Sequence, residues 1–153
     1  VPDWCSVDKF DNFDKLEGRN SGFGYEALRV PFRIALDYYW FDSHEAKMFL
    51  VGFSKFLNNQ MKLFNAIYCE YDYSGKAVKV YESPAFYSCY YFSLKAGKSK
   101  YTQFAIEATR QYIKKYTNGS YYQNKDQYYS NCLSWLADGS EGGYIKNIAD
   151  KDK

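Results

Sequence analysis

The sequence predicts a mostly α-helical fold of helical hairpins, with one short β-hairpin. Apolar residues recur at spacings of three and four through five separate segments, which is the period of a helix packed on one side. A single segment rich in aromatic and β-branched residues surrounds a Ser-Gly pair, which is typical of a hairpin. A chain of 153 residues is long enough for one domain with its own core or for a piece of a larger one. We expect residues 1–153 to belong to a single domain, of which they form a part, with no second domain.

The first two predicted helices form a hairpin. The first covers residues 25–41, and the second begins at Asp42 or Ser43. Glu45, three residues after Asp42, suits a capping box. The pair Asn58-Asn59 is expected to end the second helix because asparagine favours helix ends over helix interiors.

The remaining elements follow in the same way. Pro84 suits the first position of a helix and Gly97 suits its end. The predicted elements are a hairpin in 67–81 that turns at Ser74-Gly75, and helices over 84–97, 101–116 and 126–137, the last closed by Gly139.

Aromatic residues make up 22% of the chain, including 18 Tyr, 12 Phe and 3 Trp. A core built from such rings carries many polar hydroxyls. The same rings also suit a groove that contacts the apolar faces and polar edges of sugars. Composition alone leaves both interpretations open.

Charge and hydropathy exclude other classes of protein. The net charge is +2, too small for the basic surface that nucleic-acid binding requires. A nucleic-acid site at Lys114-Lys115-Tyr116 is therefore not favoured. No run of 18 apolar residues occurs, so we expect no membrane-spanning segment.

No pattern in the chain indicates a metal or cofactor. The four cysteines form no C-x-x-C pair, and there is one histidine, His44. A zinc site of the usual thiolate and imidazole type is therefore not expected. Phosphate-binding and nucleophile-elbow motifs are absent. The pairing of the cysteines stays open.

One group of charges lies on a single predicted helix face. Glu26, Arg29, Arg33 and Asp37 follow one another at spacings of three, four and four, while nearly all residues between them are apolar. This pattern predicts a helix buried on all sides, with Arg33 and Asp37 as an internal ion pair. The alternative is that Glu26 faces a cleft and Arg29 holds its carboxylate.

The segment YEALRVPFRIALDYYW resembles the Y-D-A-x-R-x-P-W-R-I-A-x-D-Y motif of family 8 glycoside hydrolases. The opening VPDWC and the later YYSNCLSWLADGS are similar to segments in the C-terminal part of that family's domain. The resemblance covers nearly the whole chain, in matching order, and the helical motif is specific.

The resemblance implies about half of an (α/α)6 barrel and an inverting attack on β-1,4-linked polysaccharide, such as cellulose or lichenan, xylan or chitosan. Glu26 matches the family's Asp general base, Arg29 its nearby arginine, and Phe32 its usual Trp. The side chain of Glu is one methylene longer than that of Asp. It therefore shortens the distance between the two catalytic carboxyl groups, which an inverting enzyme keeps at about 6.5–9.5 Å so that a water molecule fits. The family's acid lies in the N-terminal half, and no motif marks an acid among Glu45, Glu82, Glu107 and Glu141.

The resulting hypothesis assigns roles to five residues. Glu26 activates water, Arg29 orients the base and the water, and Tyr25, Trp4 and Tyr38 line the sugar groove. The implied partners are a β-1,4-linked polysaccharide or oligosaccharide and either the missing N-terminal half or a second copy. The implied location is secreted, although the chain shows no signal sequence. The alternative is a non-catalytic carbohydrate-binding or assembly module.

Overall fold

The computed structural model confirms a mostly helical chain with a few short antiparallel strand pairs, consistent with part of a barrel of helical hairpins. The structure describes residues 2–19, 22–97, 102–122 and 124–147. The five described helices are α1 (Arg29–Phe41), α2 (His44–Phe64), α3 (Pro84–Gly97), α4 (Gln103–Tyr116) and α5 (Tyr128–Glu141). Within the described residues, no helix combines the length and apolar character needed to cross a bilayer.

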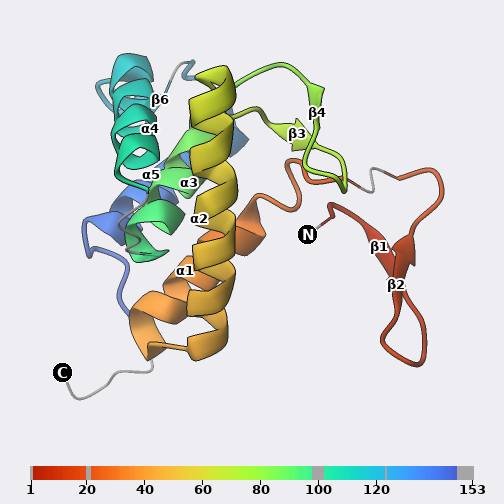
Figure 1. The fold of residues 1–153 in the computed structure, drawn as a ribbon. Helices are drawn as coiled ribbons and strands as arrows, with labels where there is room; N and C mark the ends of the chain where they lie inside the picture. The colour runs from red at the N-terminus through yellow and green to blue at the C-terminus, as the bar shows by residue number, and fades with distance from the viewer. Residues whose placement is uncertain (1, 20–21, 98–101, 123, 148–153) are drawn as a thin grey trace.

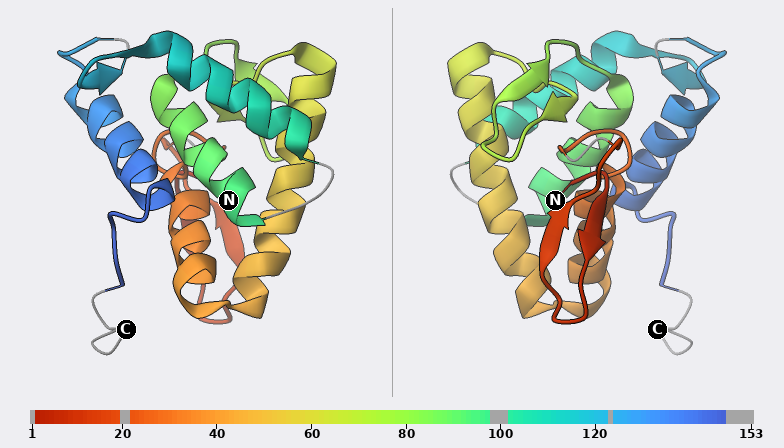
Figure 2. Two further views of the ribbon diagram at one scale, coloured as in Figure 1. Left: turned by 90° about the vertical axis from the view of Figure 1, so that its left-hand side faces the viewer. Right: turned by 90° about the vertical axis from the view of Figure 1, so that its right-hand side faces the viewer.

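Helix α3 lies at the centre and contacts each of the other four helices (Figure 2). Its sequence explains this place, because Lys95 is the one charged residue between Pro84 and Gly97 and almost every other side chain is buried. A helix that is apolar on all sides has to be surrounded. The predicted bounds of this helix, 84–97, are confirmed.

Helices α1, α3 and α5 run in the same direction. The Tyr25 ring, just before α1, contacts Phe86 at the start of α3 and Tyr129 at the start of α5, with ring centroids 4.7 and 6.0 Å apart. Helices α2 and α4 run the opposite way (Figure 2) and pack on α3. The layer formed by α1, α3 and α5 therefore has one end where all three helices begin and one where all three finish.

Large rings fill the core, as the composition predicts. Tyr87 and Tyr90 are almost completely buried, and Phe86 lies beside Tyr90 with its ring centroid 5.8 Å away. The Tyr87 hydroxyl accepts a hydrogen bond from the Ile67 N–H and donates one to Glu82. Tyr87 can be buried because its hydroxyl finds hydrogen-bond partners, whereas the buried Tyr90 hydroxyl has none among the described residues.

The prediction that the first helix is buried on all sides, with its charges inside, is wrong. The buried residues of α1 are Pro31, Phe32 and Ala35, whereas Arg33 and Asp37 are both exposed. Within the described residues no ion pair joins these two side chains. The helix also begins at Arg29, and residues 25–28 form a turn. The charges share a face, as the spacing predicts, but that face points to solvent.

Helix α2 starts at one of its two predicted positions, because Ser43 caps it by accepting from the Ala46 N–H at 3.3 Å, whereas the predicted capping box from Asp42 does not form. Three other helix boundaries differ from prediction, the end of α2 and both ends of α5, which begins at Tyr128 and not at Asp126. Helix α2 continues through Asn58, which is buried, to Phe64. Helix α5 continues past Gly139 to Glu141, and Gly142 is its C-cap. Tyr101, the predicted start of the fourth helix, lies outside the described residues.

The predicted hairpin is confirmed as strands β3 (Glu70–Tyr71) and β4 (Ala77–Lys79), which turn through Ser74 and Gly75. Two further hairpins have no counterpart in the prediction. They are β1 (Cys5–Val7) with β2 (Phe13–Lys15), and β5 (Thr117–Asn118) with β6 (Tyr121–Tyr122). The β1–β2 hairpin stands apart from the helices (Figure 1), and its Val7, Phe10 and Phe13 are exposed.

Candidate active site

The turn that carries Glu26 is fixed by the N-terminal segment. One carboxylate oxygen of Asp3 accepts hydrogen bonds from the N–H groups of Gly24, at 2.9 Å, and Ala27, at 2.7 Å. The Asp3 N–H donates to the Gly22 carbonyl at 2.6 Å. The aspartate therefore binds N–H groups that precede the first full turn of α1, as a capping side chain does.

Two other elements hold the same turn. Phe23 and Tyr71 exchange both backbone hydrogen bonds, at 2.8 and 3.0 Å, which ties the turn to strand β3. The Tyr129 hydroxyl, from α5, donates to the Tyr25 carbonyl at 3.3 Å. Segments far apart in the sequence thus fix the backbone on both sides of Glu26.

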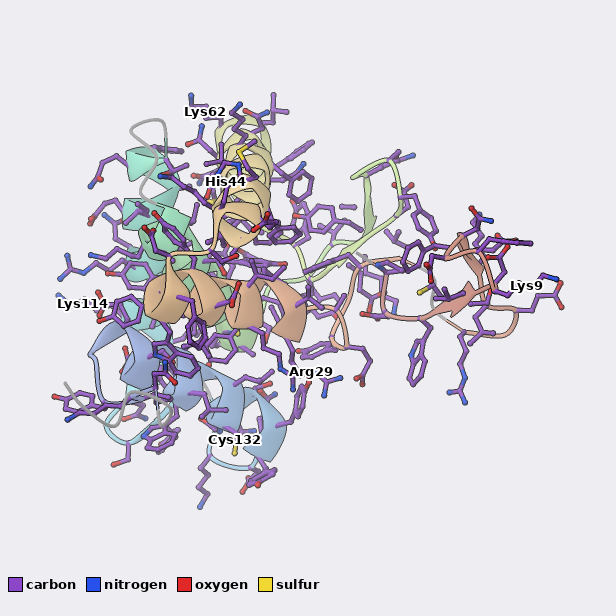
Figure 3. The ribbon with its side chains drawn as sticks, turned by 90° about the horizontal axis from the view of Figure 1, so that it is seen from below. Lys9, Arg29, His44, Lys62, Lys114 and Cys132 are labelled. Carbon is purple, nitrogen blue, oxygen red and sulfur yellow. The ribbon has the colours of Figure 1, made fainter. Side chains whose placement is uncertain are left out.

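Glu26 and Arg29 form an ion pair at the start of α1. Their side chains are 45% and 38% exposed, so a molecule in solvent has access to both groups. The Arg29 Nε also donates to the Glu26 carbonyl at 3.3 Å. The spacing of three residues predicts this contact. Figure 3 shows Arg29 at the end of α1 from which the chain leads to the β1–β2 hairpin, with Lys9 on that hairpin far from the helices.

Aromatic rings form a groove beside this ion pair. The groove lies at the start of α5, has a volume of about 360 Å³, and is lined by Tyr25, Gln127, Tyr128, Tyr129 and Ser130. Burial raises the pKa of Tyr129, Arg29 lowers it and Glu26 raises it. Tyr129 is therefore close enough to the ion pair for both charges to act on its hydroxyl. Glu26 and Arg29 do not themselves line the groove, but they lie next to its wall at Tyr25 and Tyr129.

Trp4 is connected to this site through the chain. It follows Asp3, which is hydrogen-bonded to the Glu26 turn, and the residue is 44% exposed. The Arg19 guanidinium lies over this ring, 5.2 Å from its centroid. The structure therefore places Trp4 next to the segment that carries Glu26, with the ring available for further contacts.

Tyr38 does not lie near Glu26. It comes nine residues after Arg29 on a straight helix, which places it about 13 Å further along the axis. There it lines a different pocket, with Tyr39 and with residues from the ends of α3 and α5. The structure brings together Glu26, Arg29 and Tyr25, adds Trp4 through Asp3, and separates Tyr38 from them.

Sequence reasoning missed Tyr128 and Tyr129 as residues of this site. The signal was present, because both belong to the YYSNCLSWLADGS segment that carries part of the family resemblance. Asp3 was likewise part of the VPDWC segment. Asp3 and Tyr129 contact residues of the Glu26 turn that are more than 20 positions away in the sequence, and helical periodicity predicts contacts only between near neighbours.

The described residues contain no group of three or more His, Cys, Asp or Glu side chains arranged to hold a metal ion. The cysteines are free thiols, with Cys69 and Cys89 buried and Cys5 and Cys132 half-buried. Burial raises the pKa of the Cys89 thiol to about 12. The polar groups that the site presents are the Glu26 carboxylate, the Arg29 guanidinium and the phenols of Tyr25 and Tyr129.

Comparison with known proteins shows similarity to clostridial endoglucanases. The chain is 32% identical to Endoglucanase 2 of Ruminiclostridium josui over 89 residues, which is 58% of this chain and 18% of that protein. It is 28% identical to Endoglucanase C of Ruminiclostridium cellulolyticum over 136 residues, or 89% of this chain and 27% of that protein. The chain thus spans about a quarter or less of the relatives' length. No protein-family model and no solved structure matches it.

Proposed function

We propose that this chain is the C-terminal portion of an inverting family 8 glycoside hydrolase domain that cleaves β-1,4-linked polysaccharide. One observation carries the proposal: an accessible carboxylate, Glu26, is held by Arg29 at the edge of a groove walled by Tyr25 and Tyr129. The similarity to two endoglucanases supports the substrate class.

In this proposal Glu26 is the general base. Its carboxylate accepts a proton from the water that attacks the anomeric carbon, and Arg29 keeps the carboxylate oriented toward that water. Tyr25 and Tyr129 contact the sugar, and Trp4, which follows Asp3 in the chain, supplies a further exposed aromatic contact. Inversion requires a second carboxyl about 6.5–9.5 Å away, on the other face of the sugar, to protonate the leaving oxygen.

That acid is proposed to come from the N-terminal half of the domain. Exposed apolar side chains support a partner of this kind, since Phe10, Phe13 and Phe64 are each more than half exposed. Apolar surface of this kind commonly marks an interface. A polymeric substrate of this class also places the proposed activity outside the cell.

The test uses the complete protein from its reading frame. We expect it to release reducing sugar from β-1,4-glucan, with products that first appear as the α-anomer in NMR spectra. Glu26→Gln should lower the rate by about 10²–10⁴-fold, because an amide does not accept the water's proton. The matched control is Glu107→Gln, an exposed helical glutamate that is likewise bonded to a neighbour, Gln111, and should leave the rate unchanged.

Near-normal turnover by Glu26→Gln would remove Glu26 from the mechanism. The 153-residue chain alone should release no reducing sugar, since the proposal places the acid elsewhere. Strong activity of the isolated chain would show that an acid lies within it.

A second candidate is a carbohydrate-binding module without catalysis. The favouring observation is that aromatic walls line pockets at both ends of the helical layer, which suits binding without requiring chemistry. A complete protein that binds β-1,4-glucan, releases no sugar and is unaffected by Glu26→Gln would establish this second function.

A further inference from the structure

A separate pocket lies at the end of the helical layer opposite to Glu26. It has a volume of about 380 Å³ and lies where α1, α3 and α5 finish. The 13 residues of α1 span about 20 Å, which separates this pocket from the Glu26 turn. Its size falls within the range of ligand pockets, about 300–1,000 Å³. We name it the distal pocket.

The floor of the distal pocket is buried and its wall is aromatic. Phe92, Ala96 and Ser140 are each less than a tenth exposed and form the floor. Tyr38 and Tyr39 form the wall, and Tyr39 is 59% exposed. A ring that solvent reaches above an apolar floor offers a flat face to a ligand with an apolar side.

Three charged side chains form the rim. The Lys95 ammonium and the Glu141 carboxylate are 3.5 Å apart, longer than a normal hydrogen bond, and both are partly exposed. Both groups therefore retain hydrogen-bonding capacity for a ligand. The third is Asp42, whose carboxylate receives no hydrogen bond from any residue that the structure describes.

The backbone at Asp42 is unusual. This residue ends α1 in the left-handed conformation, with φ of 51°. Glycine or asparagine is the common choice at such a position, because other side chains are strained there. Aspartate instead places a carboxylate at the rim of the distal pocket.

We propose that the distal pocket binds a sugar ring of a neutral β-linked saccharide. The apolar face of the ring lies on Tyr39, and its hydroxyls donate to Asp42 and Glu141 and accept from Lys95. The choice of a saccharide as the ligand rests on the function proposed above. The existence and position of the pocket are observed independently of that function. A polysaccharide bound here is held on a face away from Glu26, so the distal pocket anchors polymer and does not position the bond that is cleaved.

Amide NMR spectra of the 153-residue chain, titrated with cellotetraose, test the proposal. We expect shifts at Tyr39, Asp42, Ala96 and Glu141 that follow one binding curve. Tyr39→Ala should raise the dissociation constant about tenfold, the effect of one lost aromatic contact. The matched control is Tyr73→Ala, which removes a tyrosine of almost equal exposure, 58%, from outside the pocket and should leave the constant unchanged.

The amides of the Glu26 turn report on the other site separately. Shifts confined to that turn would overturn the distal pocket while leaving the proposed catalytic site intact. Absence of any shift, or equal binding by the Tyr39→Ala and parent chains, would also overturn the distal pocket. Asparagine suits the left-handed backbone at position 42, so Asp42→Asn should weaken binding without loss of fold. This variant tests the pocket even if Tyr39→Ala fails to fold. If Glu26→Gln left the rate of the complete protein unchanged while the distal pocket still bound cellotetraose, the proposed hydrolase mechanism would be overturned and the distal pocket would stand.

Discussion

Replacing Asp3 with alanine should loosen the turn that carries Glu26. The aspartate accepts from the N–H groups of Gly24 and Ala27, at 2.9 and 2.7 Å, and both of these residues are buried. A hydrogen bond to a charged group contributes about 1.5–3 kcal/mol, and buried donors left without a partner are unfavourable. Because both bonds share one oxygen they are not additive, so we expect the free energy of unfolding to fall by about 2–4 kcal/mol.

Urea denaturation of the 153-residue chain measures this loss. Asp3→Asn keeps an acceptor oxygen without the charge, and should lose less than half as much. Asp14→Ala, on the exposed β2 strand, is the control and should change the free energy of unfolding by less than about 0.5 kcal/mol. Hydrogen exchange at the Gly24 and Ala27 amides should accelerate in Asp3→Ala alone. A loss below about 0.5 kcal/mol for Asp3→Ala would refute its role in holding the turn.

Two further predictions concern stability. Arg33→Ala should change the free energy of unfolding by less than about 0.5 kcal/mol, because Arg33 is exposed and lacks an ion partner within the described residues. If urea denaturation showed a loss of several kcal/mol, the prediction of a buried ion pair with Asp37 would be supported after all. Burial raises the pKa of Cys89 to about 12 and that of Tyr90 well above its usual value. The folded state keeps these protons while the unfolded chain releases them, so stability should be full below about pH 8.5 and fall as the pH rises further. A urea midpoint that stays level between about pH 7 and 11 would contradict this.

Local signals in the sequence predict much of the fold. Helix α3 has the predicted bounds because Pro84 and Gly97 mark its two ends and the residues between them are almost all apolar. The hairpin at Ser74-Gly75 forms where the pattern places it, and Gly75 has the positive φ, 81°, that its turn requires. Signals of this kind depend only on neighbouring residues.

Tertiary contacts decide the features that the sequence did not predict. Asn58 is expected to end α2, yet it is buried within a helix that continues to Phe64, because packing overrides its weak helix propensity. The charges on α1 share a face, but periodicity does not tell which way that face points. The strands β5 and β6 have two residues each, too few for any alternation to appear.

The same limit applies to the candidate site. The contact between Glu26 and Arg29 follows from their spacing in one turn. The contacts of Asp3 and Tyr129 with that turn join residues 24 and 104 positions apart, which only the folded chain brings together. Tyr38 shares a helix with Arg29, but the length of that helix carries it to the opposite end of the layer.

The direction of the helices also constrains where the proposed acid approaches. Glu82 lies before α3, at the same end of the layer as Glu26, but it is bound by Tyr87 and lines a groove with Met61 and Tyr112 from α2 and α4. Glu70 accepts from Lys79 at 2.8 Å and from the Tyr81 hydroxyl at 3.1 Å. Glu141 lines the distal pocket at the far end. These three carboxylates are thus engaged in other sites.

Glu26 is partly exposed, and the neighbouring groove exposes Tyr129 and Tyr128, which are 41% and 78% exposed. A sugar lying on these rings presents its other face away from α1 and α5. In an inverting reaction the acid acts on that opposite face, about 6.5–9.5 Å from the base. The half of the domain proposed to supply the acid therefore has to cover this aromatic surface, so that the two carboxyls enclose the sugar between them.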